Sequence, residues 1–371
     1  MTNNYIDPGE QVSARWLTAV LRQSGALPQG EVVSFEQRDT GAFNSQTHRL
    51  VLRYSSEAPA AAPAHVVIKR NEHEDGFDEV TFYNCVAQLP DHPDVTIPCY
   101  AAARDEDSGD SYLLFEDLSA THAPPVTRDQ QISIVDGVPS QQAIEQVVDT
   151  LARLHAYWWE HPLMTTDTFE VGYWSRNRER FELYHQRRQR SWRNLLTNNP
   201  DWIPRDICEL YESVLEALPE YWERYLEPRF RDGAQITLVH GDAYFANYLT
   251  PKHDASGTTY LLDWQSPTFD IGGYDLANLC AAFWTSEQRQ QDQREQRILR
   301  RYHEGLHAHG VDRYSWDDLL LDYRHGLIFW LLMPVQDGSD GSQRSYWWPK
   351  MQCLVAAFRE WRCHELLNST Y

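Results

Sequence analysis

The sequence is short of positive charge. Its 371 residues carry 33 lysines and arginines against 54 aspartates and glutamates, which gives a formal net charge of −21 at pH 7. Nucleic acids and anionic membranes are bound through basic patches, so we expect neither a nucleic acid nor a membrane as a partner. An acidic surface suits a cationic substrate, but the needs of solubility explain the charge equally well.

Long apolar runs and cysteine motifs are also absent from the sequence. The longest apolar run, residues 327–335, has nine residues, whereas a helix needs about 20 to cross a bilayer. The first ten residues, MTNNYIDPGE, hold neither a basic segment nor an apolar core, so we expect no signal peptide. The six cysteines form no C-x-x-C pair, which is typical of a reduced protein without a disulfide framework or zinc site. Together these absences predict a cytoplasmic protein.

The most informative part of the sequence is the segment 237–279. It opens within an apolar run, residues 236–239, which predicts a short buried strand. The motif His-Gly-Asp follows and ends at Asp242, and Asn247 lies five residues after that aspartate. A second apolar run delivers Asp263 at its end. We therefore expect two acids and an amide at the mouths of two short strands.

This combination of side chains suits phosphoryl transfer. The reaction needs a carboxylate to orient the attacking hydroxyl and accept its proton, and metal ions to bridge phosphate oxygens. We predict that Asp242 is the base and that Asn247 and Asp263 supply oxygen ligands to Mg²⁺. The spacing H-x-D-x-x-x-x-N is also that of the protein-kinase catalytic loop. The alternative is a β-hairpin with incidental Asp and Asn in its turns, and the register of all three residues speaks against it.

The motifs HGDAYFAN, LLDWQ and GGYDLANL resemble the aminoglycoside phosphotransferase and choline kinase superfamily, and most of all its ecdysteroid-kinase-like branch and bacterial relatives. That family keeps glycine where protein kinases have the arginine of their HRD motif, here Gly241. The sequence DWQ, beginning at Asp263, replaces DFG, so no phenylalanine-based switch is expected. The family also carries an acidic residue in a YDLA-like segment, here Asp275, which we interpret as structural support for the catalytic loop rather than as a metal ligand.

The first part of the chain predicts a small sheet. An amphipathic helix is expected at 10–22, followed by antiparallel strands at 32–38, 47–54 and 64–70 and further strands at 98–103 and 111–115. The polar segment 39–46 contains a single glycine and by itself favours a hairpin turn. The resemblance implies instead a loop over the nucleotide phosphates, with Gly41, Asn44 and Ser45 as candidates.

Lys69 ends the apolar strand Val-Val-Ile-Lys, which is similar to the V-A-I-K strand whose lysine binds the α- and β-phosphates of ATP. A lysine at a strand end can also simply extend into solvent. The functional interpretation requires an acidic partner from the next helix, and Glu79 is our candidate. Glu72, Glu74, Asp75 and Asp78 are alternatives nearby in the sequence.

The strand before residue 117 runs into a polar segment. In the resembling superfamily such a tether joins the two lobes and its backbone holds adenine, which makes Glu116 and Leu118 candidates for nucleotide binding. The alternative is an ordinary strand end.

After residue 140 the sequence pattern is helical. Ser140 is the predicted cap of a long amphipathic helix, and His155 within it is expected to be a packed core residue. Helices are also expected at 177–195, 205–224, 316–332 and 346–367. The segment 288–309 predicts one strongly charged helix with a solvated face.

These observations predict an α+β, two-lobed protein-kinase-like fold. Residues 1–116 would form an antiparallel-sheet lobe that binds the nucleotide, and residues 117–371 a larger, mostly helical lobe with the catalytic loop and acceptor site. The expected function is an ATP- and Mg²⁺-dependent kinase of a small-molecule acceptor, acting as a monomer or homodimer. The main alternative is a nucleotide-binding pseudokinase or scaffold, and a metal-dependent hydrolase would leave Lys69 without a role.

Overall fold

The computed structural model describes residues 12–39, 46–71, 77–105, 107–166, 174, 176–253 and 257–367. The chain divides into two compact units. The first unit comprises Met1–Ala123 with two returning segments, Pro251–Asp254 and Tyr260–Ser266. The second comprises Pro124–Thr250, Ala255–Thr259 and Pro267–Tyr371. The predicted lobe boundary at residue 116 therefore falls within the first unit.

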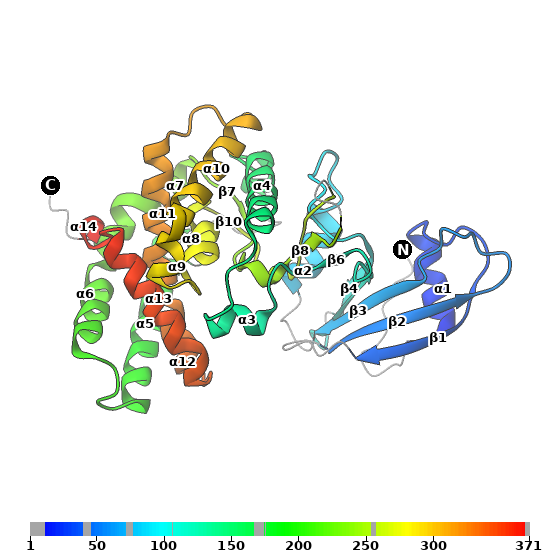
Figure 1. Ribbon diagram of the computed structural model, residues 1–371, viewed down its shortest axis with the longest axis horizontal. Helices are drawn as coiled ribbons and strands as arrows, with labels where there is room; N and C mark the ends of the chain where they lie inside the picture. The colour runs from blue at the N-terminus through cyan, green and yellow to red at the C-terminus, as the bar shows by residue number, and fades with distance from the viewer. Residues whose placement is uncertain are drawn as a thin grey trace. The chain divides into compact units, whose positions relative to one another are not determined.

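The first unit is built on a five-stranded sheet in the order β1-β2-β3-β5-β4, in which every neighbouring pair is antiparallel (Figure 1). Its strands are β1 (Val32–Asp39), β2 (Gln46–Tyr54), β3 (His65–Asn71), β4 (Cys99–Arg104) and β5 (Ser111–Glu116). The short strands β6 (His122–Ala123) and β9 (Tyr260–Leu261) also belong to this unit. The order places β3, which carries Lys69, in the middle of the sheet.

Helix α1 (Ala14–Gln23) covers one face of this sheet. Ser13 caps it by accepting a hydrogen bond from the Trp16 N–H at 3.2 Å. Its apolar face buries Leu17 and Leu21 against strand residues such as Leu50. This is the packing that the amphipathic pattern of the segment predicts.

The second unit is mostly helical (Figure 1). Its α-helices are α3 (Arg128–Ser133), α4 (Gln141–Tyr157), α5 (Arg178–Asn198), α6 (Arg205–Tyr221), α7 (Glu227–Asp232), α8 (Gly273–Ala281), α9 (Ser286–Gln290), α10 (Arg294–Ala308), α11 (Trp316–Trp330), α12 (Met333–Ser339), α13 (Arg344–Glu360) and α14 (His364–Leu367). Within the described part of the chain, none of the helices is long and apolar enough to cross a membrane.

Two of these helices pack closely because glycines stand at their crossing. A Cβ atom on Gly273 of α8 would lie 2.0 Å from the backbone oxygen of Asp322 on α11, and one on Gly326 of α11 would lie 2.1 Å from the backbone oxygen of Gly273. No side chain fits at such distances, so the backbones of α8 and α11 approach directly.

A short antiparallel pair, β7 (Thr237–Val239) with β10 (Thr268–Asp270), lies within the helical unit. All six residues are buried. Strand β7 ends at Val239, so the His-Gly-Asp motif begins where the buried strand stops. The predicted short strand before the motif is therefore present.

Two predicted helices are interrupted. The segment 288–309 contains a break between α9 and α10, where Asp292 and Gln293 have positive φ angles of 50° and 55°. Its predicted solvated face is also wrong in part, because Arg289 is fully buried in ion pairs with Glu295 and Glu360. Likewise, the expected helix at 346–367 divides into α13 and α14 at Arg362, which has a φ of 54°.

Candidate functional site

Lys69 lies in an acidic environment within the first unit. Its Nζ atom is 2.6 Å from Oε2 of Glu79 and also pairs with the carboxylate of Asp263. The Glu79 side chain is 1% exposed and that of Lys69 is 11% exposed. Burial would lower the pKa of Lys69, but the two carboxylates raise it, so the ammonium stays charged. The expected Lys69–Glu79 ion pair is present, whereas a role for Lys69 in phosphate binding stays a prediction.

Glu79 lies on the short helix α2 (Phe77–Thr81), which continues into a π-helical turn, Phe82–Val86. Residues three apart on a helix share a face, so Phe82 lies on the same side as Glu79. Its ring stacks on Trp264, with centroids 3.8 Å apart and the planes within 8°. One short element therefore supplies both the acidic partner of Lys69 and the support for the residue that follows Asp263. This support was not predicted from the sequence.

Asp263 lies two residues after the end of β9 and has a φ of 62°. This left-handed conformation is uncommon for residues other than glycine, and such residues occur often at functional sites. The turn is closed by the Gln265 N–H, which donates to the Asp263 carbonyl at 2.9 Å. Trp264 is fully buried and donates its indole N–H to the Leu261 carbonyl at 3.1 Å. The fixed turn leaves the Asp263 side chain 41% exposed.

Asp242, in the second unit, is held by amides. Its Oδ1 accepts a hydrogen bond from Nδ2 of Asn278 at 3.3 Å, and its Oδ2 lies 3.4 Å from Nδ2 of Asn247. Gly241 before it has a φ of 84°, which explains why this position of the motif is glycine. Asn278 belongs to α8 and was not among the predicted site residues. Its place in the segment GGYDLANL, one helical turn after Asp275, is the sequence signal that could have revealed it.

A hydrogen bond donated by its side-chain nitrogen orients Asn247. Its Nδ2 donates to the Asp242 backbone carbonyl at 2.8 Å, so Oδ1 is the atom left to bind a cation. An amide oxygen and a carboxylate are hard ligands of the kind that Mg²⁺ takes, and thus Asn247 and Asp263 fit the predicted metal by their chemistry. Among the residues that the structure describes, no group of three or more His, Cys, Asp or Glu side chains forms a metal site. The assignment of Asn247 and Asp263 as joint ligands stays a prediction, since they belong to different compact units.

Asp275 supports the loop that carries Asp242, as expected. Its carboxylate accepts hydrogen bonds from the backbone N–H groups of His240, at 2.7 Å, and Gly241, at 3.0 Å. Nε2 of His155 lies 3.2 Å from the same carboxylate, and Nδ1 of His155 lies 2.7 Å from the Tyr302 hydroxyl. Asp275, His155 and Tyr302 are fully buried. His155 is therefore a core histidine, as predicted, and Tyr302 is an additional member of this network.

The tether candidates lie at the end of β5. The Glu116 N–H donates to the Pro98 carbonyl at 2.9 Å, and the Leu118 carbonyl accepts from the N–H groups of Thr121 and His122. No hydrogen bond of the Leu118 N–H is found among the described residues, and a role for it in binding adenine stays a prediction. The other nucleotide-binding candidates, Gly41, Asn44 and Ser45, lie outside the described residues.

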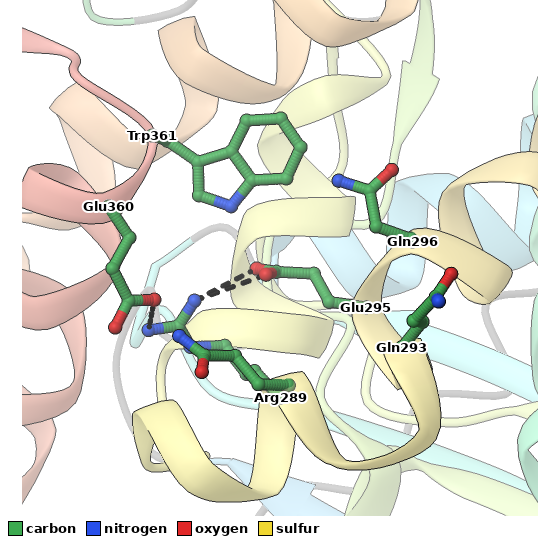
Figure 2. Close-up of a pocket in the computed structure, with 7 residues that line it drawn as sticks. Arg289, Gln293, Glu295, Gln296, Glu360 and Trp361 are labelled. Carbon is green, nitrogen blue, oxygen red and sulfur yellow. Dashed lines mark hydrogen bonds and ion pairs between the residues drawn. The ribbon is translucent and has the colours of Figure 1, made fainter.

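A cavity of about 480 Å³ lies in the second unit (Figure 2). It is lined by Arg289, Gln290, Gln293, Glu295, Gln296, Glu360 and Trp361. Nη1 of Arg289 lies 3.1 Å from Glu295, and Nη2 lies 2.7 Å from Glu360. The arginine thus joins α9, α10 and α13, which is a structural role.

Comparison with solved structures identifies the fold. A crystal structure of choline kinase from Cryptosporidium parvum Iowa II is 11% identical, has a TM-score of 0.54, and the match covers 96% of this chain and 98% of that one. The structure of the GDP and kanamycin complex of APH(2″)-IIia is 13% identical, has a TM-score of 0.50, and covers 94% and 98%. These likenesses confirm the predicted α+β fold of the kinase type.

The family follows from the sequence. The model of the ecdysteroid kinase-like family matches residues 80–311, which is more than half of the chain. The chain belongs to the ecdysteroid kinase-like family. No curated protein matches it by sequence.

Proposed function

We propose that the protein is an ATP-dependent kinase that transfers the γ-phosphate to a hydroxyl group of a small molecule. The observation that carries this proposal is the Asp242 carboxylate, which lies just after a buried strand with an amide donor near each oxygen. Amide donors orient a carboxylate without neutralising it, so it can still accept a proton. The family assignment supports the same reaction class.

In this proposal, the residues of the first unit bind the nucleotide. Lys69, oriented by Glu79, neutralises the α- and β-phosphates, as the corresponding lysine of kinases does. The backbone of Glu116 and Leu118 binds adenine, and Gly41, Asn44 and Ser45 cover the phosphates. ATP is the expected nucleotide.

Asp242 receives the acceptor hydroxyl and takes up its proton. As the acceptor oxygen bonds to the γ-phosphorus, the bond between that phosphorus and the β,γ-bridging oxygen breaks and ADP leaves. Asn247 and Asp263 would hold Mg²⁺, which when bound neutralises the charge that develops on the phosphate oxygens. Asp275 acts one step removed, because it holds the backbone from which Asp242 projects.

The acceptor is a small molecule that carries an alcohol group. The similar structures include a choline kinase and a complex with kanamycin, and the family is named for its likeness to ecdysteroid kinases. Amino alcohols, aminoglycosides, sugars and polyhydroxylated steroids therefore make up the first panel of acceptors. We further propose a cytoplasmic protein that acts as a monomer or a homodimer.

The test is a transfer assay with γ-labelled ATP and Mg²⁺ across this panel, run beside ATP-dependent thermal stabilisation. We expect ATP to stabilise the protein, slow hydrolysis without an acceptor, and a labelled product with at least one acceptor class. Stabilisation by ATP with neither hydrolysis nor product would overturn the kinase and favour the nucleotide-binding scaffold. An absence of stabilisation would overturn both.

A further inference from the structure

Three aromatic rings of the helical unit surround one lysine. The Nζ atom of Lys350, on α13, lies 5.6 Å from the ring centroid of Phe283, 5.4 Å from that of Trp330 and 5.3 Å from that of Tyr346. We call these three rings the aromatic box. Each distance is within the range in which a cation is attracted to the face of a ring. The protein's own ammonium group therefore occupies the place that a cationic ligand would seek.

Lys350 is held firmly in this position. Its side chain is 6% exposed and its Nζ lies 3.0 Å from Oδ2 of Asp337 on α12. Burial would lower the pKa of Lys350, but Asp337, Tyr346 and Asp242 together raise it, so the ammonium is charged at neutral pH. A buried ion pair that is also in contact with three rings is costly to dismantle.

The aromatic box adjoins the catalytic loop. The ring of Tyr244, two residues after Asp242, lies 5.8 Å from that of Phe283, which in turn lies 6.2 Å from Tyr346. Phe283 follows the end of α8, the helix whose Asn278 donates to Asp242. Asp242 is also near enough to raise the pKa of Tyr346. An acceptor whose hydroxyl reaches Asp242 therefore meets this aromatic wall.

A second cation approaches the same wall. The guanidinium carbon of Arg128, on α3, lies 5.7 Å from the centroid of Tyr346. Tyr346, a partly buried member of the aromatic box, thus has two positive groups of the protein near its ring. Oδ2 of Asp337 lies 3.0 Å from the same lysine, and Asp242 is near enough to raise the pKa of that lysine, so both signs of charge are already present.

We propose that Lys350 determines acceptor specificity: by filling the aromatic box, it restricts the site beside Asp242 to alcohols that are uncharged near the reacting hydroxyl. The inference deepens the proposed function and rests on it. An ammonium group on the acceptor would find the rings occupied and would be repelled by Lys350. An anionic group would face Asp242 and Asp337. An acceptor that is uncharged, whether apolar or hydroxylated, is repelled by neither the lysine nor the carboxylates.

The experiment compares choline with its carbon analogue, 3,3-dimethylbutan-1-ol, which has the same shape and hydroxyl group without the charge. Binding to the full-length protein is measured by ligand-observed NMR titration, and phosphorylation by kcat/KM with ATP. We expect the uncharged alcohol to bind at least tenfold more tightly than choline. Equal or tighter binding of choline overturns the proposal. Binding of neither alcohol overturns it as well, because the wall would then not receive acceptors.

Two variants test whether Lys350 causes the preference for the uncharged alcohol. Lys350→Met removes the ammonium, and we expect it to reduce the preference for the uncharged alcohol at least tenfold. The double variant Lys350→Met, Asp337→Asn also removes the carboxylate left behind, and it should give the same result if the single variant folds poorly. Arg344→Met is the matched control: Arg344 lies on the same helix with its guanidinium 4.1 Å from Trp202, a ring that is not part of the aromatic box. It should leave the preference unchanged.

The experiments distinguish a failure of the proposed kinase function from a failure of the proposed role of Lys350. If the protein is not a kinase, neither alcohol is phosphorylated, yet the binding preference and its dependence on Lys350 persist. If the charge proposal is wrong, choline binds as well as its analogue, or Lys350→Met leaves the ratio unaltered, whatever the outcome of the transfer assay.

Discussion

The two compact units hold their key carboxylates in different ways. In the first unit, Glu79 and Asp263 share the ammonium group of Lys69. In the second, Asp242 accepts a hydrogen bond from the side-chain amide of Asn278, and Asp275 accepts from two backbone N–H groups and lies 3.2 Å from Nε2 of His155. The first arrangement keeps a buried cation charged, whereas the second fixes the position of the acids through amide and backbone N–H groups.

This difference agrees with the two tasks that phosphoryl transfer sets. Binding of phosphates needs a fixed positive charge, which the carboxylates around Lys69 maintain. Proton acceptance needs an oriented carboxylate, and the amides of Asn247 and Asn278 orient that of Asp242. The contrast predicts that substitutions in the first unit act mainly on nucleotide use, and those around the catalytic loop mainly on the rate of transfer.

The largest effect is expected from Asp275→Ala, which removes the acceptor of the His240 and Gly241 N–H groups and the partner of His155. Each buried donor left without a partner costs about 1–3 kcal/mol, so we expect a loss of about 5 kcal/mol in the free energy of unfolding. Chemical denaturation measures it. Asp275→Asn retains one acceptor oxygen and should cost less, and equal losses for the two variants would contradict the role of the carboxylate.

Lys69→Met tests the ion pair between Lys69 and Glu79 in the first unit. Removing the cation leaves Glu79 buried without its partner, which costs about 3–4 kcal/mol in stability. The variant should also lose ATP-dependent thermal stabilisation. Lys69→Met combined with Glu79→Gln should recover most of the stability but none of the ATP binding. If the double variant binds ATP normally, Lys69 has no role at the phosphates.

The variant Asp270→Asn tests how burial of a carboxyl group in the second unit makes the stability depend on pH. Asp270 is buried, its Oδ2 has no hydrogen-bond partner within the described residues, and burial raises its pKa to about 7. Because the folded pKa is above the unfolded one, the wild type loses stability as pH rises through about 7, while the asparagine variant does not. Relative to wild type, the variant should gain roughly 2–3 kcal/mol between pH 5 and pH 8.

Denaturation at the two pH values measures this gain. The exposed Asp136 provides a matched control, since Asp136→Asn should show little change with pH. If the difference in stability between Asp270→Asn and the wild type did not change between the two pH values, Asp270 would be ionised in the folded protein throughout this range.

Phe82→Leu is expected to have the smallest effect. It removes the ring that stacks on Trp264 and should lower the free energy of unfolding by about 1–1.5 kcal/mol. Since Trp264 follows Asp263, the variant should also raise the Mg²⁺ concentration needed for transfer. Phe35→Leu, in the sheet, is the control for loss of a ring alone. An unchanged Mg²⁺ requirement in Phe82→Leu would show that the stacking of Phe82 on Trp264 does not affect the function of Asp263.

The site residues that could be predicted from the sequence either lie close to one another in the chain or stand at the end of a helix or strand. Asp242 and Asn247 stand five residues apart in one loop, and Lys69 ends a strand pattern whose acidic partner had to come from the next helix. Asp275 was assigned correctly as support for the loop. In each case, short-range spacing fixes where the side chain lies relative to its element.

The unpredicted parts depend on residues far apart in the sequence. Tyr302 reaches His155, and Lys350 reaches Phe283, through the packing of helices whose order and angle no local pattern specifies. The break at Asp292 and Gln293 has no glycine or proline to mark it. The burial of Arg289 depends on Glu360, which is distant in the sequence, so its segment resembled a solvated helix.

The central claim, that Asp242 is the proton acceptor of a kinase, is tested most directly by single-turnover transfer of labelled γ-phosphate to the best acceptor of the panel. Asp242→Asn preserves the size of the side chain but removes its basicity, so we expect the rate to fall by about 10³-fold while ATP still stabilises the protein. A variant that transfers phosphate within tenfold of the wild-type rate would contradict the account.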